Sequence, residues 1–484
     1  MQEGNVATEK KPLRDRLPVP TKLFYGLGTA VDMWGIWLYP SVAFALFNMY
    51  LGVSPWLVGL ALTLIRVFDA IVDPVVGWVS DNLRTRHGRR RPFILIAGIL
   101  SGLMLPILFW ISPSWINIKF LGVSVIFWYM LGSNLIYIPI ISSFTVPYYS
   151  LSNEMTPDYE ERTSIMAYRS MAQKVFELGN FYALRFTNLA WFLIPGTGEK
   201  NVLLGLKVYS SILGLVMVVF AVIIFFKTKE RYYDTVVVNV KEKISLLSSY
   251  GETLRCKPFR QMVIVGASFI IGTSMVGSLG YYATVFYVSA GNKVMGDNWQ
   301  FFMGIAFMLG GVIGVPLLST IAHHIGKRRA VVVACCIGIL GYGGSWFLYT
   351  PKIVWLQTVA SGLMGMAAAS LWMLHSSIGA DIIDYDELNT HERREGSFTA
   401  CASYILKLGN SLGYFFSGLI LSWVGFTWDR QVQLPSTILG IRVSLAFLPI
   451  AGMILAIIFV LKMPITKQIA QENRRKLEER RGAV

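Results

Sequence analysis

RVFDAIVDPVVGWVSDNLRTRHGRRRPFI, residues 66–94, joins two different kinds of sequence. Its first part is apolar except for Arg66, Asp69 and Asp73, whereas residues 84–91 hold five arginines. An apolar run suits the interior of a membrane helix, and lysine and arginine gather in the loops on one side of a membrane. The stretch therefore predicts a helix that crosses a bilayer and ends in a loop at its surface.

The whole chain has the composition of a membrane protein. Of its 484 residues, 54% are hydrophobic and 15% are charged, which is too apolar for the surface of a soluble protein of this length. A helix needs about 20 apolar residues to cross the hydrocarbon core, and such runs recur along the chain. We predict twelve membrane helices, at about 23–50, 56–80, 92–112, 118–150, 162–193, 203–227, 261–289, 299–323, 329–350, 353–380, 397–424 and 440–462.

The basic residues act as topology signals. The net charge is +15, but lysine and arginine lie between apolar runs rather than on a soluble module, which argues against nucleic-acid binding. They are concentrated after the second helix, after the eighth helix and in the tail, which predicts a multi-pass protein of the inner (plasma) membrane with both termini cytoplasmic. The four cysteines form no CxxC pair and lie near no histidine cluster, so we expect neither a disulfide framework nor a metal site.

The chain reads as two related six-helix halves. GRRRP at 88–92 follows the second helix and GKRR at 326–329 follows the eighth, while DYEER at 158–162 corresponds in position to DYDELNTHERREG at 384–396. Such repeats are typical of transporters that arose by duplication. The predicted fold class is an all-α membrane protein with two pseudo-symmetric halves. The predicted parts are a cytoplasmic N-terminal segment (1–22), a first six-helix half (23–227), a cytoplasmic linker (228–260), a second six-helix half (261–462) and a cytoplasmic basic tail (463–484).

Arg66, Asp69 and Asp73 are spaced i, i+3, i+7, so a helix places them on one face. A carboxylate in hydrocarbon costs about 2.5–3.5 kcal/mol, so two on one face should look into an aqueous cavity and find a cation. We interpret them as a site for a coupling cation, Na⁺ or H⁺. The alternative is a structural salt-bridge network that holds the halves together, with Pro74 marking a break in the helix.

Further polar groups interrupt other apolar helices. Asp32 and Arg169, with an aromatic ring, could bind a polyhydroxylated ligand through hydrogen bonds to its hydroxyls and contact with its C–H surface. For any single aromatic, packing or the interfacial belt is the better explanation. Lys174 and Glu177 are one turn apart and are expected to form a structural pair. His375 is interpreted as a polar packing residue, with a proton relay as the alternative.

Longer motifs resemble one transporter family. They are RVFDAIVDPVVGWVSD (66–81) with RTRHGRRRPF (84–93), VPYYSLSNEMTPDYEERTSIMAYR (146–169), ADIIDYDELNTHERREGSF (380–398) and ILKLGNS (405–411). On these motifs the chain resembles the glycoside-pentoside-hexuronide:cation symporters of the major facilitator superfamily, typified by the melibiose permease. RHGRRRPFI (86–94) is also similar to plant sucrose transporters.

The resemblance implies the major facilitator fold and alternating access around a central cavity. It places the cation site on Asp69, Asp73, Ser142 and Lys407. It places the sugar site on Arg169, Tyr149 and Trp372, in a pocket that also contains Asp32 and Thr145.

Three departures from the melibiose permease bear on these expectations. Val72 stands where the permease has an asparagine, and it offers no oxygen; because Na⁺ needs several oxygen ligands and a proton needs one carboxylate, this favours H⁺. Thr145 replaces an aspartate of the galactoside site, and Asp32-Met33 aligns with a Lys-Asp pair. Both of these changes fall in the sugar pocket, so the expected substrate is a glycoside, pentoside or uronide other than melibiose.

The predicted function is secondary active transport, a symport of a sugar or glycoside into the cell that is coupled to H⁺ or Na⁺. We expect no cofactor, no nucleic acid and no obligate protein partner beside the substrate, the cation and the bilayer. No histidine-rich set, nucleophile elbow or phosphate loop points to an enzyme. The alternatives are a lysolipid or other small-molecule carrier and a proton-driven exporter. Charged residues in the cytoplasmic loops are expected to form a gate latch: Arg84, Arg89, Arg90, Asp158, Asp384, Arg393 and Arg394.

Overall fold

The computed structural model describes residues 16–83, 85–86, 88–156, 159–194, 200–230, 251, 253–390 and 394–481. Arg84, Asp158 and Arg393 of the predicted latch lie outside these residues, as does most of the linker predicted over 228–260.

The first half of the chain contributes six long helical runs. Two of them change helix type near their ends: α1 (Val19–Ala43) continues into the π-helical segment η1 (Phe44–Tyr50), and α3 (Arg91–Met104) continues into the 3-10 segment η2 (Leu105–Phe109). The other runs are α2 (Pro55–Asn82), α4 (Val125–Met155), α5 (Tyr159–Phe186) and α6 (Val202–Lys227). Short elements between them are η3 (Pro113–Asn117), β1 (Lys119–Phe120), β2 (Val123–Ser124) and η4 (Ala190–Phe192).

The second half contributes six more. The first run is interrupted, as α8 (Lys257–Val276), α9 (Leu279–Tyr282) and the π-helical η6 (Ala283–Val288). It is followed by α10 (Lys293–Ile325), α11 (Lys327–Leu348), α12 (Leu356–Thr390), α13 (Glu395–Trp423) and α14 (Pro435–Leu461). A further helix, α15 (Lys467–Arg481), packs against α12. The described residues therefore contain the twelve long helical runs that the sequence predicts.

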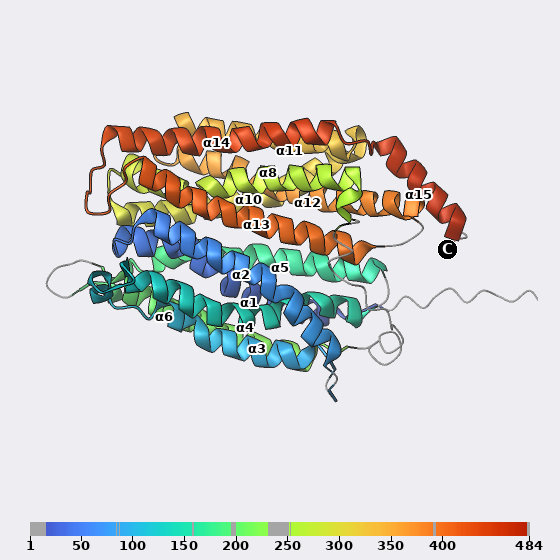
Figure 1. Ribbon diagram of the computed structural model, residues 1–484, viewed down its shortest axis with the longest axis horizontal. Coiled ribbons are helices and arrows are strands. Elements are labelled where there is room, and N and C mark those ends of the chain that lie inside the picture. Colours follow the sequence, from blue (N-terminus) through green and yellow to red (C-terminus); the bar gives the residue numbers. More distant parts are fainter. Residues whose placement is uncertain are drawn as a thin grey trace, which may run out of the picture.

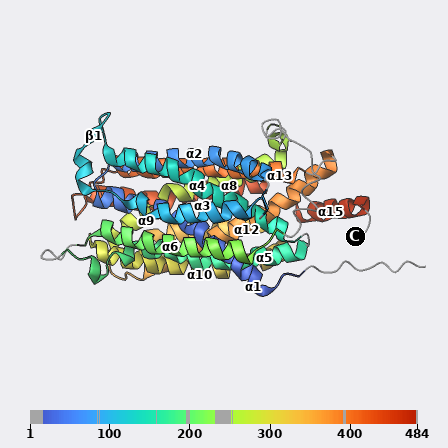
Figure 2. The same cartoon turned by 90° about the horizontal axis from the view of Figure 1, so that it is seen from below.

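The helices run side by side in one bundle whose two layers correspond to the two halves of the sequence (Figure 1). The start of α1 and helix α15 lie at one end of the bundle, and β1 lies at the opposite end (Figure 2). We call the end with α15 the terminal end. We call the end with β1, where the connections after η1, η4 and η6 also lie, the distal end.

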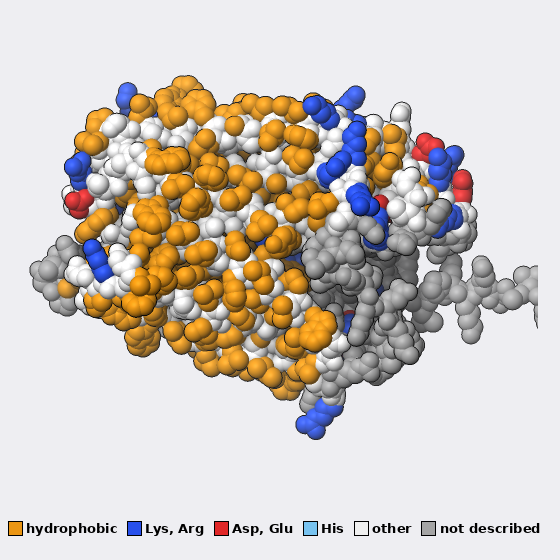
Figure 3. Space-filling model, viewed as in Figure 1, with side chains coloured by type: hydrophobic (Ala, Val, Ile, Leu, Met, Phe, Trp, Pro, Cys, Tyr) orange, Lys and Arg blue, Asp and Glu red, His pale blue; other side chains and the backbone are white. Residues whose placement is uncertain are grey.

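Most of the bundle surface suits a lipid environment. Ten of the helical runs are long and apolar enough to cross a membrane. Side chains on the face in Figure 3 are mostly hydrophobic, with lysine and arginine toward the two ends. The remaining runs, α5 and α13, are 28 and 29 residues long but carry charged residues such as Arg169 and Lys407. They pack where the halves meet, α5 against α10 and α13 against α2.

Two helix boundaries differ from the predicted ones for identifiable reasons. α4 begins at Val125 rather than near 118, because 119–124 forms a tight hairpin with positive φ at Leu121 (52°) and Gly122 (78°). Positive φ at both central residues is the geometry of the common two-residue hairpin turn. α12 continues to Thr390, about ten residues past its predicted end, so the acidic residues of the 384–396 motif begin on a helix.

The halves are in backbone contact at the distal end. A Cβ on Gly418 of α13 would lie 2.4 Å from the carbonyl oxygen of Pro55, and one on Gly59 of α2 would lie 2.6 Å from that of Tyr414. Small residues allow membrane helices to approach this closely. Thr63 adds a hydrogen bond of 2.9 Å to the carbonyl oxygen of Ser411.

Candidate cation and substrate sites

The paired aspartates of α2 meet a lysine from the other half. Lys407 Nζ lies 2.9 Å from Asp69 Oδ2 and 2.5 Å from Asp73 Oδ2. Ser142 of α4 donates to Asp69 Oδ1 at 3.3 Å, and Arg66 Nη1 lies 3.4 Å from Asp69 Oδ2. The four residues that the resemblance assigns to the cation site thus lie together, and Arg66 joins them.

The cluster is balanced in charge but uneven in exposure. Two carboxylates face two cations, so no net charge is left when all four groups are ionised. The Asp69 side chain is 4% exposed, whereas Asp73 and Lys407 are 31% and 28% exposed. Arg66 is buried, donates to the carbonyl oxygen of Ile36 at 3.0 Å and stacks on the Trp37 ring. Asp73 is therefore the more accessible of the two carboxylates.

A second polar cluster surrounds Asp32 of α1. Its carboxylate accepts a hydrogen bond of 2.7 Å from the Tyr149 hydroxyl and one of 3.4 Å from Thr145, both on α4. The Arg169 guanidinium carbon lies 4.0 Å from the centre of the Tyr149 ring. Arg169 Nε is buried without a hydrogen-bond partner, and within the described residues no ion pair engages this side chain. Four of the five predicted substrate residues therefore lie in one place.

Trp372 is the exception. It lies on α12, where its ring meets Phe269 and His375 edge-on at 6.2 and 5.7 Å between centroids. No hydrogen bond or ring contact among the described residues joins it to the Asp32 cluster. His375 is buried, its Nε2 has no partner, and it packs beside Gly266. The predicted pairing of Lys174 and Glu177 is present at 2.8 Å.

Helix α4 connects the two clusters. Ser142, which contacts Asp69, and Thr145 and Tyr149, which contact Asp32, are spaced i, i+3, i+7 and so share one face. Neighbouring turns of an α-helix are 5.4 Å apart. A small shift or rotation of this one helix would therefore change the surroundings of both carboxylates at once.

The basic loop after α2 is held by two carboxylates. Glu154 Oε1 accepts from Arg89 Nε at 2.9 Å and from Arg90 Nε at 3.2 Å. The Glu230 carboxylate, just beyond α6, accepts from the backbone N–H groups of Arg89, Arg90 and Arg91 at 2.8, 2.8 and 2.9 Å. Burial raises the pKa of Glu230, although these three N–H groups act in the opposite direction.

The second half has a comparable arrangement. Lys327, which begins α11, lies 2.7 Å from Asp381 of α12, and Arg394 lies 2.8 Å from Asp386. Of the predicted latch residues that are described, Arg89, Arg90 and Arg394 each contact a carboxylate. Asp384 lies on α12, two residues before the Asp386 that pairs with Arg394. Glu230 and Asp386 were missed because a carboxylate next to a helix end has no distinctive sequence pattern.

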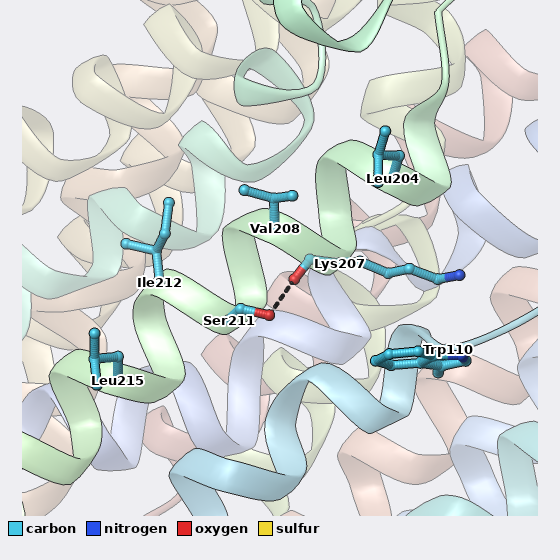
Figure 4. A pocket seen from close by; sticks show the side chains of 7 residues that line it. All are labelled: Trp110, Leu204, Lys207, Val208, Ser211, Ile212 and Leu215. Atoms are coloured by element: carbon cyan, nitrogen blue, oxygen red, sulfur yellow. Dashed lines mark hydrogen bonds between the residues drawn. The ribbon is translucent and has the colours of Figure 1, made fainter.

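A surface groove along α6 is a separate feature. It has a volume of about 560 Å³ and lies along α6, where Ser211 donates to the carbonyl oxygen of Lys207 at 2.7 Å (Figure 4). Its lining is mostly apolar: Trp110, Leu204, Lys207, Val208, Ser211, Ile212 and Leu215. It contains none of the residues of the two charged clusters.

The charged clusters lie between the helices of an apolar bundle, and a comparison with known families shows what kind of protein this is. A family model described as MFS/sugar transport protein matches residues 25–467. The chain belongs to this family. The predicted major facilitator fold and the resemblance to the glycoside-pentoside-hexuronide:cation symporters are thereby confirmed. This MFS protein is a multi-pass membrane transporter and not an enzyme.

Individual relatives span nearly the whole MFS chain. It is 27% identical over 489 residues to the glucuronide carrier protein homolog of Escherichia coli (strain K12), covering 96% of this chain and 98% of that protein. It is 24% identical over 448 residues to the isoprimeverose transporter of Lactiplantibacillus pentosus, covering 88% and 86%. A solved structure of a bacterial homolog to the human lysosomal transporter Spinster, inward-facing and unoccupied, matches with a TM-score of 0.64 at 14% identity, covering 94% and 96%.

Proposed function

We propose that this MFS protein is a symporter that carries a sugar or glycoside into the cell by alternating access, driven by H⁺, with both termini cytoplasmic. The observation that carries the proposal is the ion cluster between the halves, in which Lys407 of α13 contacts Asp69 and Asp73 of α2. Relatives named glucuronide carrier homolog and isoprimeverose transporter support the sugar class of the substrate.

The ligands available at the cluster favour a proton over Na⁺. The Lys407 ammonium already lies within 2.9 Å of both carboxylates, and Val72, between them in sequence, is a packed hydrophobic residue. A Na⁺ ion would have to displace the ammonium and find further oxygen ligands. A proton needs only one lone pair of Asp73, the more exposed acid.

Protonation would act directly on the interface between the halves. With both aspartates ionised, Lys407 is attracted to two negative charges on α2. A proton on Asp73 removes one of them, so the attraction between α13 and α2 weakens and the halves can rearrange. This makes the protonation state of one carboxylate a determinant of the conformational equilibrium.

The Asp32 cluster offers the groups that a sugar requires. Asp32 can accept from ligand hydroxyls, Arg169 can donate to them, and the Tyr149 ring offers a face for C–H groups. Ser142, Thr145 and Tyr149 on one face of α4 supply a route by which binding in this pocket affects the Asp69 cluster. A lysolipid carrier would be expected to line this place with apolar groups.

The driving force is adequate for accumulation. One charge moving inward gains about 2.3 kcal/mol per 100 mV of membrane potential, and each unit of pH gradient adds about 1.4 kcal/mol for a proton. Because tenfold accumulation requires about 1.4 kcal/mol, the two together support a neutral solute gradient of two orders of magnitude or more.

Uptake into proteoliposomes tests the proposal. Neutral glycosides, neutral pentosides and anionic hexuronides would be offered under an inward pH gradient or an inward Na⁺ gradient, each imposed alone. We expect accumulation of one class under the pH gradient. Accumulation under the Na⁺ gradient alone would replace H⁺ by Na⁺, and no response to either gradient would refute symport.

Variants make the test specific to the cluster. Asp69→Asn and Asp73→Asn should abolish gradient-driven accumulation while substrate binding persists. Asp429→Asn, in an exposed loop at the distal end, is the matched control and should accumulate substrate normally. Accumulation retained in both cluster variants would remove these residues from the coupling site.

Two further arms separate the alternatives. Liposomes with an inward proton gradient and internal sugar would report export as loss of the sugar. A fluorescent lysolipid would report lipid transfer in the same liposomes. Either result in place of uptake would overturn the assignment.

A further inference from the structure

The distal ends of the first and seventh helical runs have the same unusual backbone. Both end in a π-helical segment, η1 and η6. Leu51 N–H donates to the carbonyl oxygen of Leu46 at 3.0 Å, and Ser289 N–H donates to that of Thr284 at 2.9 Å. π-helical turns are uncommon and often mark functional positions. The π-helical turns therefore occur at equivalent positions in the two halves.

The two equivalent ends contact each other. Tyr282 Oη donates to the side-chain oxygen of Asn48 at 2.6 Å and lies 3.3 Å from the carbonyl oxygen of Phe44, 238 residues away. Tyr282 is fully buried. Leu51 and Ser289, whose N–H groups make the π-type hydrogen bonds, are also 238 residues apart. Phe44 and Tyr282 are therefore at equivalent positions of the two halves, and they contact each other where the halves meet.

A buried ion pair closes the interface beside this contact. Lys200, which precedes α6, lies 2.5 Å from Asp297 Oδ2 on α10, and the Asp297 side chain is 0% exposed. Tyr281 donates to the other oxygen of Asp297, and Lys200 also donates to Asn188 at 2.6 Å. Lys293 Nζ donates to the carbonyl oxygen of Met49 at 3.0 Å, again across the halves. Lys200, Asp297 and Lys293 therefore each have a polar partner.

Such a pair suits a closure that must reopen. Burying two charges costs much of what their attraction returns, so a buried pair adds little net stability. On opening, both groups regain water, which limits the cost of breaking the contact. A purely apolar seal has no such compensation. By contrast, the pairs Lys22–Glu161, Arg89–Glu154 and Lys327–Asp381 at the terminal end each join residues of one half.

We propose that Asp297 and Lys200, together with the Tyr282–Asn48 contact, form a second, reversible latch at the distal end, which holds the distal mouth of the transport path closed. This distal latch is separate from the predicted gate latch in the cytoplasmic loops. The latch rests on the proposed alternating-access function, but it makes a claim about conformation that is testable without a known substrate. The state seen in the structure is then the one closed at the distal end.

Hydrogen–deuterium exchange of the whole protein in lipid nanodiscs tests the latch. Asp297→Asn and Lys200→Met should each speed exchange in peptides covering 44–53 and 281–297 by about tenfold or more, because removing one partner leaves the other charge buried and unpaired. Exchange at the terminal end, in peptides covering 16–24 and 80–91, should slow at the same time as that end closes. Asp429→Asn is the control and should change neither set.

Paired substitutions separate a latch from general damage. The double variant Asp297→Asn with Lys200→Met removes both charges of the pair and should exchange more slowly at the distal end than either single variant. Exchanging the two charges, Asp297→Lys with Lys200→Asp, should restore protection toward that of the natural chain. Faster exchange at both ends, or no change at the distal end, would overturn the latch. Absence of sugar uptake with the exchange pattern intact would instead refute the proposed substrate.

Discussion

Replacement of Lys407 by methionine should expose how strongly the cation cluster couples the halves. Lys407 Nζ lies 2.5 Å from Asp73 Oδ2, and the two side chains are 28% and 31% exposed. At an effective dielectric constant of about 20, the Coulomb attraction at this distance is about 6–7 kcal/mol as an upper bound. Desolvation removes several kcal/mol of that gain. Because charged hydrogen bonds contribute about 1.5–3 kcal/mol net, we expect a coupling energy of about 2 kcal/mol.

A double-mutant cycle measures this coupling. Lys407→Met, Asp73→Asn and the double variant would be unfolded by SDS titration in mixed micelles, followed by tryptophan fluorescence. The double variant should be more stable than the sum of the single effects predicts, by about 2 kcal/mol. A matched cycle of Lys407→Met with Asp381→Asn, whose carboxylate pairs with Lys327 instead, should be additive. A coupling below about 0.5 kcal/mol between Lys407 and Asp73 would refute the contact as a mechanical link.

Three more predictions address other parts of the molecule. Asp32→Asn weakens acceptance of hydrogen bonds in the substrate cluster and should lower substrate affinity about 10- to 100-fold in equilibrium binding, from a loss of about 1.5–3 kcal/mol; an unchanged Kd would exclude Asp32 from the pocket. Gly418→Ala places a Cβ 2.4 Å from a carbonyl oxygen and should destabilise the protein by about 1–3 kcal/mol, whereas Gly132→Ala, with nothing within 4 Å, should not; equal effects would contradict the close approach. Burial raises the pKa of Glu230 above its ordinary value of 4.5. The contribution of protonated Glu230 to the stability of the fold should therefore be complete below pH 4.5 and be lost as the pH rises through the pKa of the folded protein. Thermal unfolding across pH should show this loss of stability in the natural chain and not in Glu230→Gln.

The sequence predicts the bundle well because its signal is local. Each helix needs only its own apolar run, and α5 and α13 could be placed because their charges interrupt runs that are still long. Asp69 and Asp73 stand out for the same reason, since two acids on one face of an apolar helix are costly. The contact of these two aspartates with Lys407 was expected only from the family resemblance. Lys407 lies at least 334 positions further along the chain, and no local pattern relates residues so far apart.

The contacts that the sequence could not predict are those between a helix end and a loop. Lys200 and Asp297 are 97 residues apart, and Asp297 lies just before the predicted start of its helix at 299, where an acid costs nothing. Trp372 is the predicted substrate residue that lies apart from the Asp32 cluster. The direction of a ring on a helix depends on packing, and here the ring packs toward Phe269.

The position of Arg66 has a consequence for how the protein is made. Lys407 is 338 residues beyond Asp69, so at 5–20 residues per second the ribosome delivers it about 20–70 s later. During that interval the second helix is in or near the membrane without its counter-ion from α13. Arg66, one turn before Asp69 on the same helix, can neutralise that carboxylate from the moment the helix forms. Replacing Arg66 with a neutral residue should therefore reduce the yield of inserted protein before it alters any property of the finished molecule.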